Sequence, residues 1–235
     1  IDFTHPMFLK EIGPPKATRI KRIWDQGLVP AALANCPPVA LLASANTYGV
    51  EFDEAEINAA LNGGAPIAHK DCDGHGTHVA GIAAGGVKFP TPGGDAEKVG
   101  VAPEADIIAV KLFDNPEEIR FRLAAGMGAL VGWEARFRDA VLYCLRTAQT
   151  PPPNGLGKPV VINMSLTNNK QPGDGLDGDA RWVDGLMDPA GPGGSLNFPT
   201  GAIIVKAAGN DGDATKRQVA RIVVPAGGQV TVPLG

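Results

Sequence analysis

The sequence predicts an α/β fold with a mostly parallel central sheet. Three apolar runs of strand length carry this prediction, at residues 105–113, 159–166 and 202–208. The runs are continuous rather than alternating, which is typical of strands covered on both faces by helices. Helical patterns separate the runs, so the chain alternates strand and helix as a parallel sheet requires.

The helical pattern is clearest at residues 133–147, where Phe137, Val141, Cys144 and Leu145 fall on one face. Shorter helices are expected at residues 53–61 and 179–187. Near the C-terminal end, residues 221–234 alternate valines around a Pro-Ala-Gly-Gly turn. This pattern predicts a β-hairpin.

Composition excludes several classes of function. The 235 residues suffice for one domain with a real core, and the net charge of −4 comes with no basic cluster. Nucleic acid is therefore not an expected partner. No apolar run approaches the ~18 residues of a membrane span, and no signal peptide is visible. The three cysteines are widely spaced and are expected to be buried free thiols: Cys36, Cys72 and Cys144.

The most informative stretch is residues 71–86, DCDGHGTHVAGIAAGG. A polar turn leads into His75, and glycines and alanines then recur at helical spacing. Small residues let a helix approach a sheet closely and hold a histidine at its N-terminus, as a general base requires. Two other interpretations compete: a purely structural histidine, or a metal site formed by His75 and His78 with Asp71 and Cys72.

Four segments in order resemble the subtilase family of serine proteases. HGTHVAGIAAG resembles the family's histidine motif, and GVAPEADIIAVK the segment that follows it. VINMSL resembles the strand that lines the substrate cleft, and AAGNDG the segment with the oxyanion asparagine. The resemblance implies a three-layer subtilisin-like fold, truncated at both ends, and a serine endopeptidase that acts on polypeptides without a catalytic cofactor.

By this resemblance His75 is the general base and His78 is not. Asn210 takes the oxyanion role, although alone it would be read as a left-handed residue after a strand. Ser165, Leu166 and Thr167 take the places that bind the substrate backbone and border the P1 pocket. Thr167 departs from the family, which has glycine there.

Two triad residues have no match in the chain. Ile1 and Asp2 match the second half of the family's Asp-x-Gly-Ile-Asp-x-x-His-Pro segment, so the catalytic aspartate would lie three residues before Ile1. No Gly-Thr-Ser nucleophile motif is present, since Gly76-Thr77 belongs to the histidine motif. The chain alone is therefore expected to be inactive. The alternative is a pseudoprotease that binds peptides.

The expected organisation is a partial catalytic core at residues 1–212, with an inserted excursion at about 9–70, followed by the start of a β-rich segment at 213–235. Parts of the excursion resemble the bacterial branch related to clostridial germination proteases. Structural calcium is common among subtilases, but residues 86–97 hold no obvious ligand set, and Asp95 and Glu97 are expected to be solvated. A secreted or cell-envelope location follows only from family habit. A nucleotide-binding domain is disfavoured, since no glycine-rich phosphate loop occurs.

Overall fold

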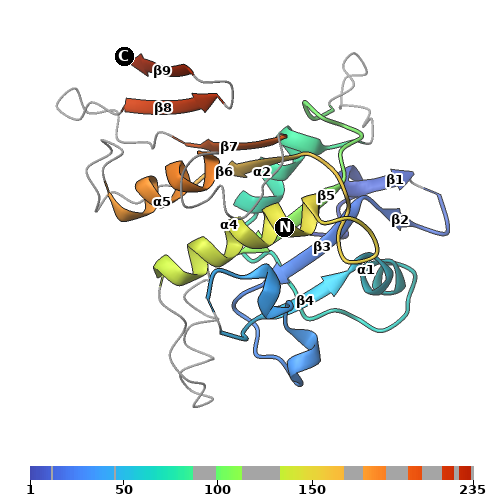
Figure 1. Cartoon of the computed structure of the whole chain (residues 1–235). Coiled ribbons are helices and arrows are strands. Elements are labelled where there is room, and N and C mark those ends of the chain that lie inside the picture. Colours follow the sequence, from blue (N-terminus) through green and yellow to red (C-terminus); the bar gives the residue numbers. More distant parts are fainter. Residues whose placement is uncertain are drawn as a thin grey trace. The chain divides into compact units, whose positions relative to one another are not determined.

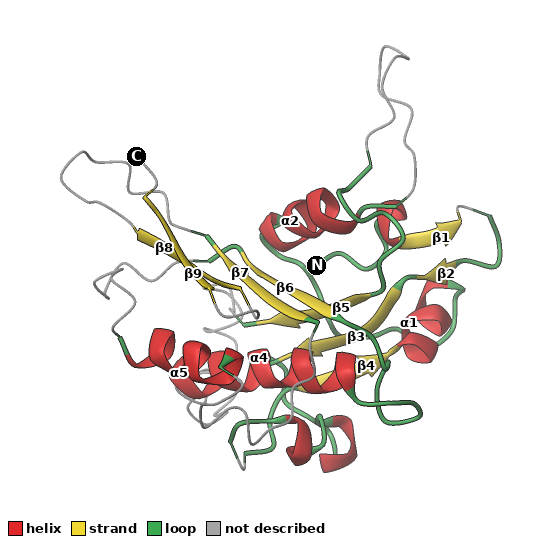
Figure 2. Ribbon diagram, turned by 45° about the horizontal axis from the view of Figure 1, so that its top comes forward, coloured by secondary structure: helices red, strands yellow, loops and turns green. Residues whose placement is uncertain are grey.

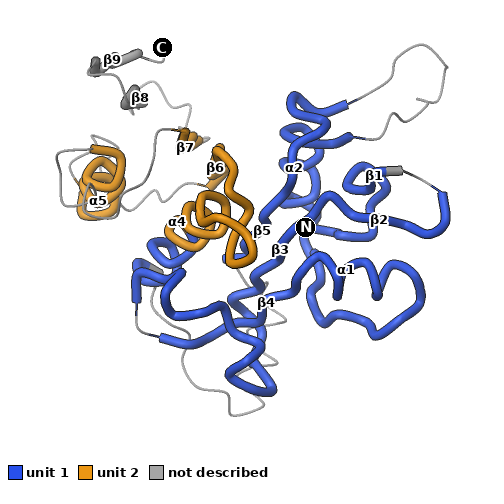
Figure 3. The backbone as a smooth tube through the Cα atoms, turned by 45° about the vertical axis from the view of Figure 1, so that its right-hand side comes forward, with its two compact units in different colours: residues 1–140 blue, residues 141–235 orange. Residues whose placement is uncertain are grey.

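The computed structural model of the chain describes residues 1–11, 13–44, 46–86, 99–112, 133–166, 177–188, 201–207, 219–224 and 228–233. The chain divides into two compact units, residues 1–140 and 141–235 (Figure 3). The first unit contains a three-stranded sheet in the order β4-β3-β5, and the second contains the pairs β6-β7 and β8-β9. Parallel pairing within both units agrees with the predicted α/β class.

The sheet of the first unit is built around β3 (Ile20–Asp25). On one side β3 pairs antiparallel with β4 (Val50–Asp53), and on the other it pairs parallel with β5 (Ile107–Lys111) (Figure 1). Ile23 lies opposite Phe52 in β4 and Ala109 in β5. A small antiparallel pair, β1 (Leu9–Glu11) with β2 (Ala17–Thr18), precedes it. The middle strand of the sheet is therefore β3, which lies far from its parallel partner β5 in the sequence.

The core of this unit lies on β3 and its neighbours. Its buried members are Phe8, Ile20, Ile23, Phe52, Ile57 and Ile107. Trp24 is also fully buried, and its indole Nε1 donates to the Tyr48 carbonyl at 3.2 Å. Burial of a large apolar side chain contributes about 1.5–3 kcal/mol, so this cluster fixes β3 firmly in place.

Two helices pack onto this cluster. Helix α1 (Glu54–Leu61) begins at a capping box, in which the Asp53 carboxylate accepts from the Glu56 amide and Glu56 accepts from the Asp53 amide. Helix α2 (His75–Ala84) places Ala80 and Ala84 against the core (Figure 2). The described part of the unit also contains three short 3₁₀ turns: η1 (Pro6–Phe8), η2 (Leu33–Asn35) and η3 (Val39–Leu41).

A buried arginine ties three backbone segments together. Arg19 is 6% exposed, and its Nη1 donates to the Ala105 carbonyl at 2.8 Å. Its Nη2 donates to the Met7 carbonyl at 2.7 Å and to the carbonyl of Ala84. Because Ala84 is the last residue of α2, the guanidinium also places positive charge at the negative end of the helix dipole. The C-terminal end of the histidine helix is thereby fixed.

Helix α4 (Trp133–Gln149) begins in the first unit and ends in the second. Its Asp139 side chain is fully buried and accepts four hydrogen bonds at 2.6–2.9 Å from the amides of Ala43 and Ser44 and the hydroxyls of Ser44 and Tyr48. These bonds anchor Ala43, Ser44 and Tyr48, which lie outside regular helices and strands, onto the helix.

The second unit pairs β6 (Val160–Met164) with β7 (Ala202–Lys206) in parallel. Helix α5 (Gly178–Met187) and the antiparallel hairpin of β8 (Val219–Val224) and β9 (Gly228–Pro233) follow the predictions for these regions. The expectation that the apolar strands are covered on both faces is wrong for this pair. Val161, Ile203 and Val205 are 65%, 53% and 48% exposed, so one face of the pair is open.

Five predicted elements are confirmed. The strands predicted at residues 105–113, 159–166 and 202–208 are β5, β6 and β7, and the helices predicted at 133–147 and 179–187 are α4 and α5. Strand β3 was not predicted. None of the three cysteines forms a disulfide, as expected, but the prediction that all three are buried is wrong: Cys36 is buried, Cys144 is partly exposed and Cys72 is exposed. Among the described residues, no helix is long and apolar enough to cross a membrane.

Candidate active site

His75 is the first residue of α2 and follows a tight turn. Gly74, the N-cap residue, has φ of +86°, a left-handed conformation that glycine adopts without strain. The side chain of His75 is exposed and makes no hydrogen bond to any other described residue. A base that must accept a proton from a nucleophile needs this combination of a fixed backbone and an accessible imidazole.

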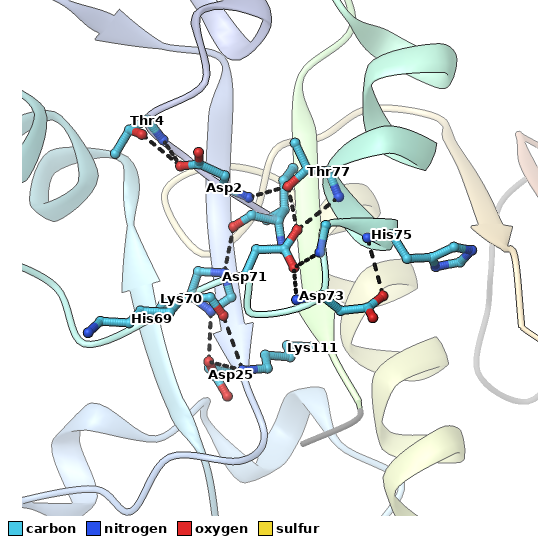
Figure 4. A network of polar contacts seen from close by, with 12 residues as sticks. Asp2, Thr4, Asp25, His69, Lys70, Asp71, Asp73, His75, Thr77 and Lys111 are labelled. Carbon is cyan, nitrogen blue, oxygen red and sulfur yellow. Dashed lines mark hydrogen bonds and ion pairs between the residues drawn. The ribbon is translucent and has the colours of Figure 1, made fainter. Parts of the chain in front are cut away.

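Asp71 organises the turn before His75 (Figure 4). One carboxylate oxygen accepts from the amides of Gly74 at 2.8 Å and Asp73 at 3.2 Å. The other accepts from the Thr77 amide at 3.1 Å and from the Thr77 hydroxyl. Burial alone would raise the pKa of Asp71, but these hydrogen bonds hold it well below its usual range. Asp71 therefore acts as a charged cap on α2 rather than as a proton donor.

The segment that matches the family's aspartate motif lies directly against this turn. The Asp2 amide donates to the Thr77 hydroxyl at 2.6 Å. The Asp2 carboxylate turns back to accept from the amide and hydroxyl of Thr4, at 2.9 and 2.7 Å. Asp2 thus stabilises its own loop. Thr77 connects the aspartate segment to the histidine helix.

The close approach that requires glycine occurs just after α2 and not within it, since a Cβ at Gly76 or Gly81 would meet no atom closer than 3.5 Å. A Cβ atom at Gly86, just after the helix, would lie 2.3 Å from the Pro103 carbonyl oxygen and 2.7 Å from the Arg19 guanidinium carbon. Such distances exclude any side chain. Glycine is therefore required where α2 meets the Arg19 contacts, which hold the helix and hence His75.

A second histidine lies buried near the site. His69 is 2% exposed, with Nδ1 2.7 Å from Asp25 Oδ2 and Nε2 2.8 Å from the Ile1 carbonyl oxygen. Asp25, at the end of β3, also accepts from the Gly27 amide at 3.0 Å and lies 3.8 Å from Lys111 Nζ. Sequence analysis missed His69, Asp25 and the Asp71–Thr77 contacts. Of these, only Asp71 had a signal in the sequence, because it lies within the histidine motif.

The other predicted site residues belong to the second unit. Ser165 and Leu166 follow β6 and are half-buried, and Ser165 Oγ accepts from Asn163 Nδ2 at 3.0 Å. Thr167 and Asn210 lie outside the described residues. The roles of Ser165, Leu166, Thr167 and Asn210 therefore stay predictions.

Metal ligation was the competing interpretation of the histidine motif. Within the part of the chain that the structure describes, no three or more His, Cys, Asp or Glu side chains are arranged to hold a metal ion. Asp95 and Glu97, considered in connection with calcium, lie outside that part.

Comparison with known proteins agrees with the motifs. The family model of the subtilase family matches residues 1–231. Among solved structures, the chain is similar to the CspB protease of Clostridium perfringens, with 25% sequence identity and a TM-score of 0.59 over 95% of this chain. The chain spans 37% of the length of that protein. A search of curated proteins finds no significant match. With a family match over nearly its whole length and the histidine turn that the motif predicts, the chain belongs to the subtilase family.

Proposed function

We propose that this chain forms part of a serine endopeptidase in which His75 is the general base. The observation that carries the proposal is the setting of His75: an exposed imidazole at the N-terminus of α2, on a turn held by Asp71 and next to the aspartate segment. The exposed imidazole is accessible to an incoming hydroxyl, which supports the role of a base.

In the proposed reaction, a serine hydroxyl attacks the peptide carbonyl while His75 takes its proton and later delivers it to the leaving amine. The aspartate of the triad holds the imidazole in the correct tautomer. Asn210 donates a hydrogen bond to the negative oxygen of the tetrahedral intermediate, an assignment that rests on the AAGN match alone. Loss of this donor lowers kcat about 10²–10³-fold in a subtilisin, a magnitude taken from that enzyme.

Residues 1–235 contain neither a Gly-Thr-Ser motif nor the triad aspartate that would precede Ile1. Loss of the serine alone lowers kcat about 2 × 10⁶-fold in a subtilisin. The polypeptide of these 235 residues is therefore proposed to be inactive alone. Activity then requires a gene product that supplies both missing groups.

The test is labelling with a serine-directed fluorophosphonate probe. The full-length gene product and the 235-residue polypeptide are compared, each also as the His75→Ala variant. We expect labelling of the full-length protein only, and its loss in the variant. His78→Ala is the matched control, because His78 is exposed on the same helix and should leave labelling unchanged.

Two results would contradict the proposal. Equal labelling of wild-type and His75→Ala protein would remove His75 as the base. Absence of labelling in a folded full-length protein would favour the pseudoprotease, a peptide-binding module without the chemistry.

A further inference from the structure

The buried pair of His69 and Asp25 stands behind the candidate active site and has no part in the chemistry proposed above. Both side chains are almost completely buried, at 0% and 2% exposure. A buried ionisable pair of this kind is costly unless all its polar atoms are bonded. Both ring nitrogens of His69 do have partners, so the arrangement is fully satisfied on the imidazole side.

The chemistry of these partners fixes where the protons lie. The Ile1 carbonyl oxygen can only accept, so Nε2 of His69 must carry a hydrogen. Nδ1 lies 2.7 Å from the Asp25 carboxylate, and two lone pairs at that distance would repel, so a hydrogen lies there too. The Gly27 amide and the Lys111 ammonium group favour the ionised form of Asp25. His69 is therefore an imidazolium that donates in both directions.

The two hydrogen bonds of His69 connect two separate segments of the chain. One hydrogen bond goes to the end of β3, which is the central strand of the rigid sheet. The other goes to Ile1, in the segment that follows the expected triad aspartate. Thr77 binds the next residue of that segment, Asp2. In the sequence, His69 precedes His75 and Thr77 follows it. Residues that flank His75 in the sequence therefore hold the aspartate segment through Ile1 and Asp2 (Figure 4).

We propose that His69 is a positioning residue of the active site: supported by Asp25, its imidazolium holds the Ile1 carbonyl and so fixes the aspartate segment relative to His75. This inference rests on the proposed serine protease function. A triad tolerates little displacement, and a misplacement of 1 Å can lower the rate by about 10²-fold. His69 does not touch substrate, so its loss should lower kcat and leave KM unchanged.

Two substitutions separate the two hydrogen bonds. His69→Gln places an amide N–H near the position of Nε2 and keeps the donation to Ile1, while the bond to Asp25 is lost. His69→Asn places its N–H near the position of Nδ1 and keeps the bond to Asp25, while the donation to Ile1 is lost. Removing the partner of a buried carboxylate is the more destabilising change, so we expect His69→Gln to be the less stable variant.

The proposal therefore predicts that activity and stability rank in opposite order. In the full-length gene product, we expect His69→Gln to keep kcat within about threefold of wild type and His69→Asn to lose about 10–10²-fold, both with unchanged KM. A merely structural role predicts that the less stable variant is the less active one. If kcat follows thermal stability, or if the two variants are equally active per folded molecule, the proposal is wrong.

Hydrogen exchange tests the positioning without activity. Backbone amides of residues 2–8 should exchange at least several-fold faster in His69→Asn than in His69→Gln. Equal exchange would overturn the proposal even in an active enzyme. Conversely, if the wild-type protein hydrolyses no peptide but this difference is seen, the proposed function fails and the positioning role stands.

The wild-type protein supplies a further measurement if both variants fail to fold. Nitrogen NMR of the histidine rings should show a hydrogen on both Nδ1 and Nε2 of His69 at neutral pH. Nε2 without a hydrogen would mean that the Ile1 carbonyl is not held, and the proposal would be refuted.

Discussion

Replacement of Arg19 by methionine tests whether the buried guanidinium holds the histidine helix. Methionine keeps much of the length and apolar contact of the side chain but removes the charge and all three donations. The carbonyls of Met7, Ala84 and Ala105 are then left without this partner. A hydrogen bond from a charged group contributes about 1.5–3 kcal/mol.

These contributions do not add fully, because burying the guanidinium costs desolvation energy. Burial lowers the pKa of Arg19, opposed by the nearby Asp106 carboxylate, which is evidence of that cost. Leaving a buried carbonyl without its donor typically costs about 1–3 kcal/mol, and three carbonyls are affected. We therefore expect Arg19→Met to lower the free energy of unfolding by about 3–5 kcal/mol. Arg19→Lys should be intermediate, since one ammonium cannot reproduce the planar fork.

The assay is urea denaturation followed by tryptophan fluorescence, because Trp24 is fully buried in β3. Arg22→Met is the matched control, three residues further along on β3: the Arg22 side chain is 28% exposed, with its Nε 4.0 Å from Glu51. A pair of this kind contributes about 0–1 kcal/mol. If the Arg19 variant were no less stable than the Arg22 variant, the idea that Arg19 holds α2 would be refuted.

Three further predictions follow from other buried groups. Asp139→Asn should destabilise the fold by about 2–4 kcal/mol, because one of the two accepting oxygens becomes an NH₂ group that faces other hydrogen-bond donors. The control is Glu134→Gln, at an exposed position of the same helix, which should lower stability by under about 1 kcal/mol in the same denaturation experiment. A thiol reagent at pH 8 should modify Cys72 rapidly and Cys144 slowly: Cys144 is partly exposed as a residue, but burial of its thiol raises the pKa to about 12, and equal rates would contradict this. The lowered pKa of Asp71 stabilises the fold above the ordinary pKa of an aspartate, and this stabilisation is lost as the pH falls through the lower, folded-state value. Stability of wild type should therefore fall more steeply below about pH 4 than that of Asp71→Asn, and parallel curves would show that Asp71 does not act this way.

The elements that sequence analysis predicted correctly have strong local signals. Strands β5, β6 and β7 are nearly continuous apolar runs, and α1 begins at Asp53 and Glu56, which are residue types typical of a capping box. The position of His75 at the start of α2 follows from the motif itself. Local pattern was sufficient in these cases, because each signal lies within about ten residues.

Strand β3 was missed because Lys21 and Arg22 interrupt its apolar residues. The structure accommodates both charges through contacts that are distant in sequence: Lys21 Nζ lies 2.7 Å from Glu54, and Arg22 pairs with Glu51. The His69–Asp25 pair was also missed, because its two members are distant in sequence and meet only after β3 is in place. Single-sequence patterns carry no signal for such pairings.

The central position of β3 also has a consequence for synthesis of the chain. Its antiparallel partner β4 follows soon after it, but its parallel partner β5 comes much later in the sequence. At about 5–20 residues per second, the ribosome completes β5 roughly 4 to 17 seconds after β3. During that interval one edge of β3 has no partner, and an open edge beside apolar side chains can pair with other chains. We expect the nascent chain to be most prone to aggregation in this interval, and chaperones that bind exposed strands to act on it then.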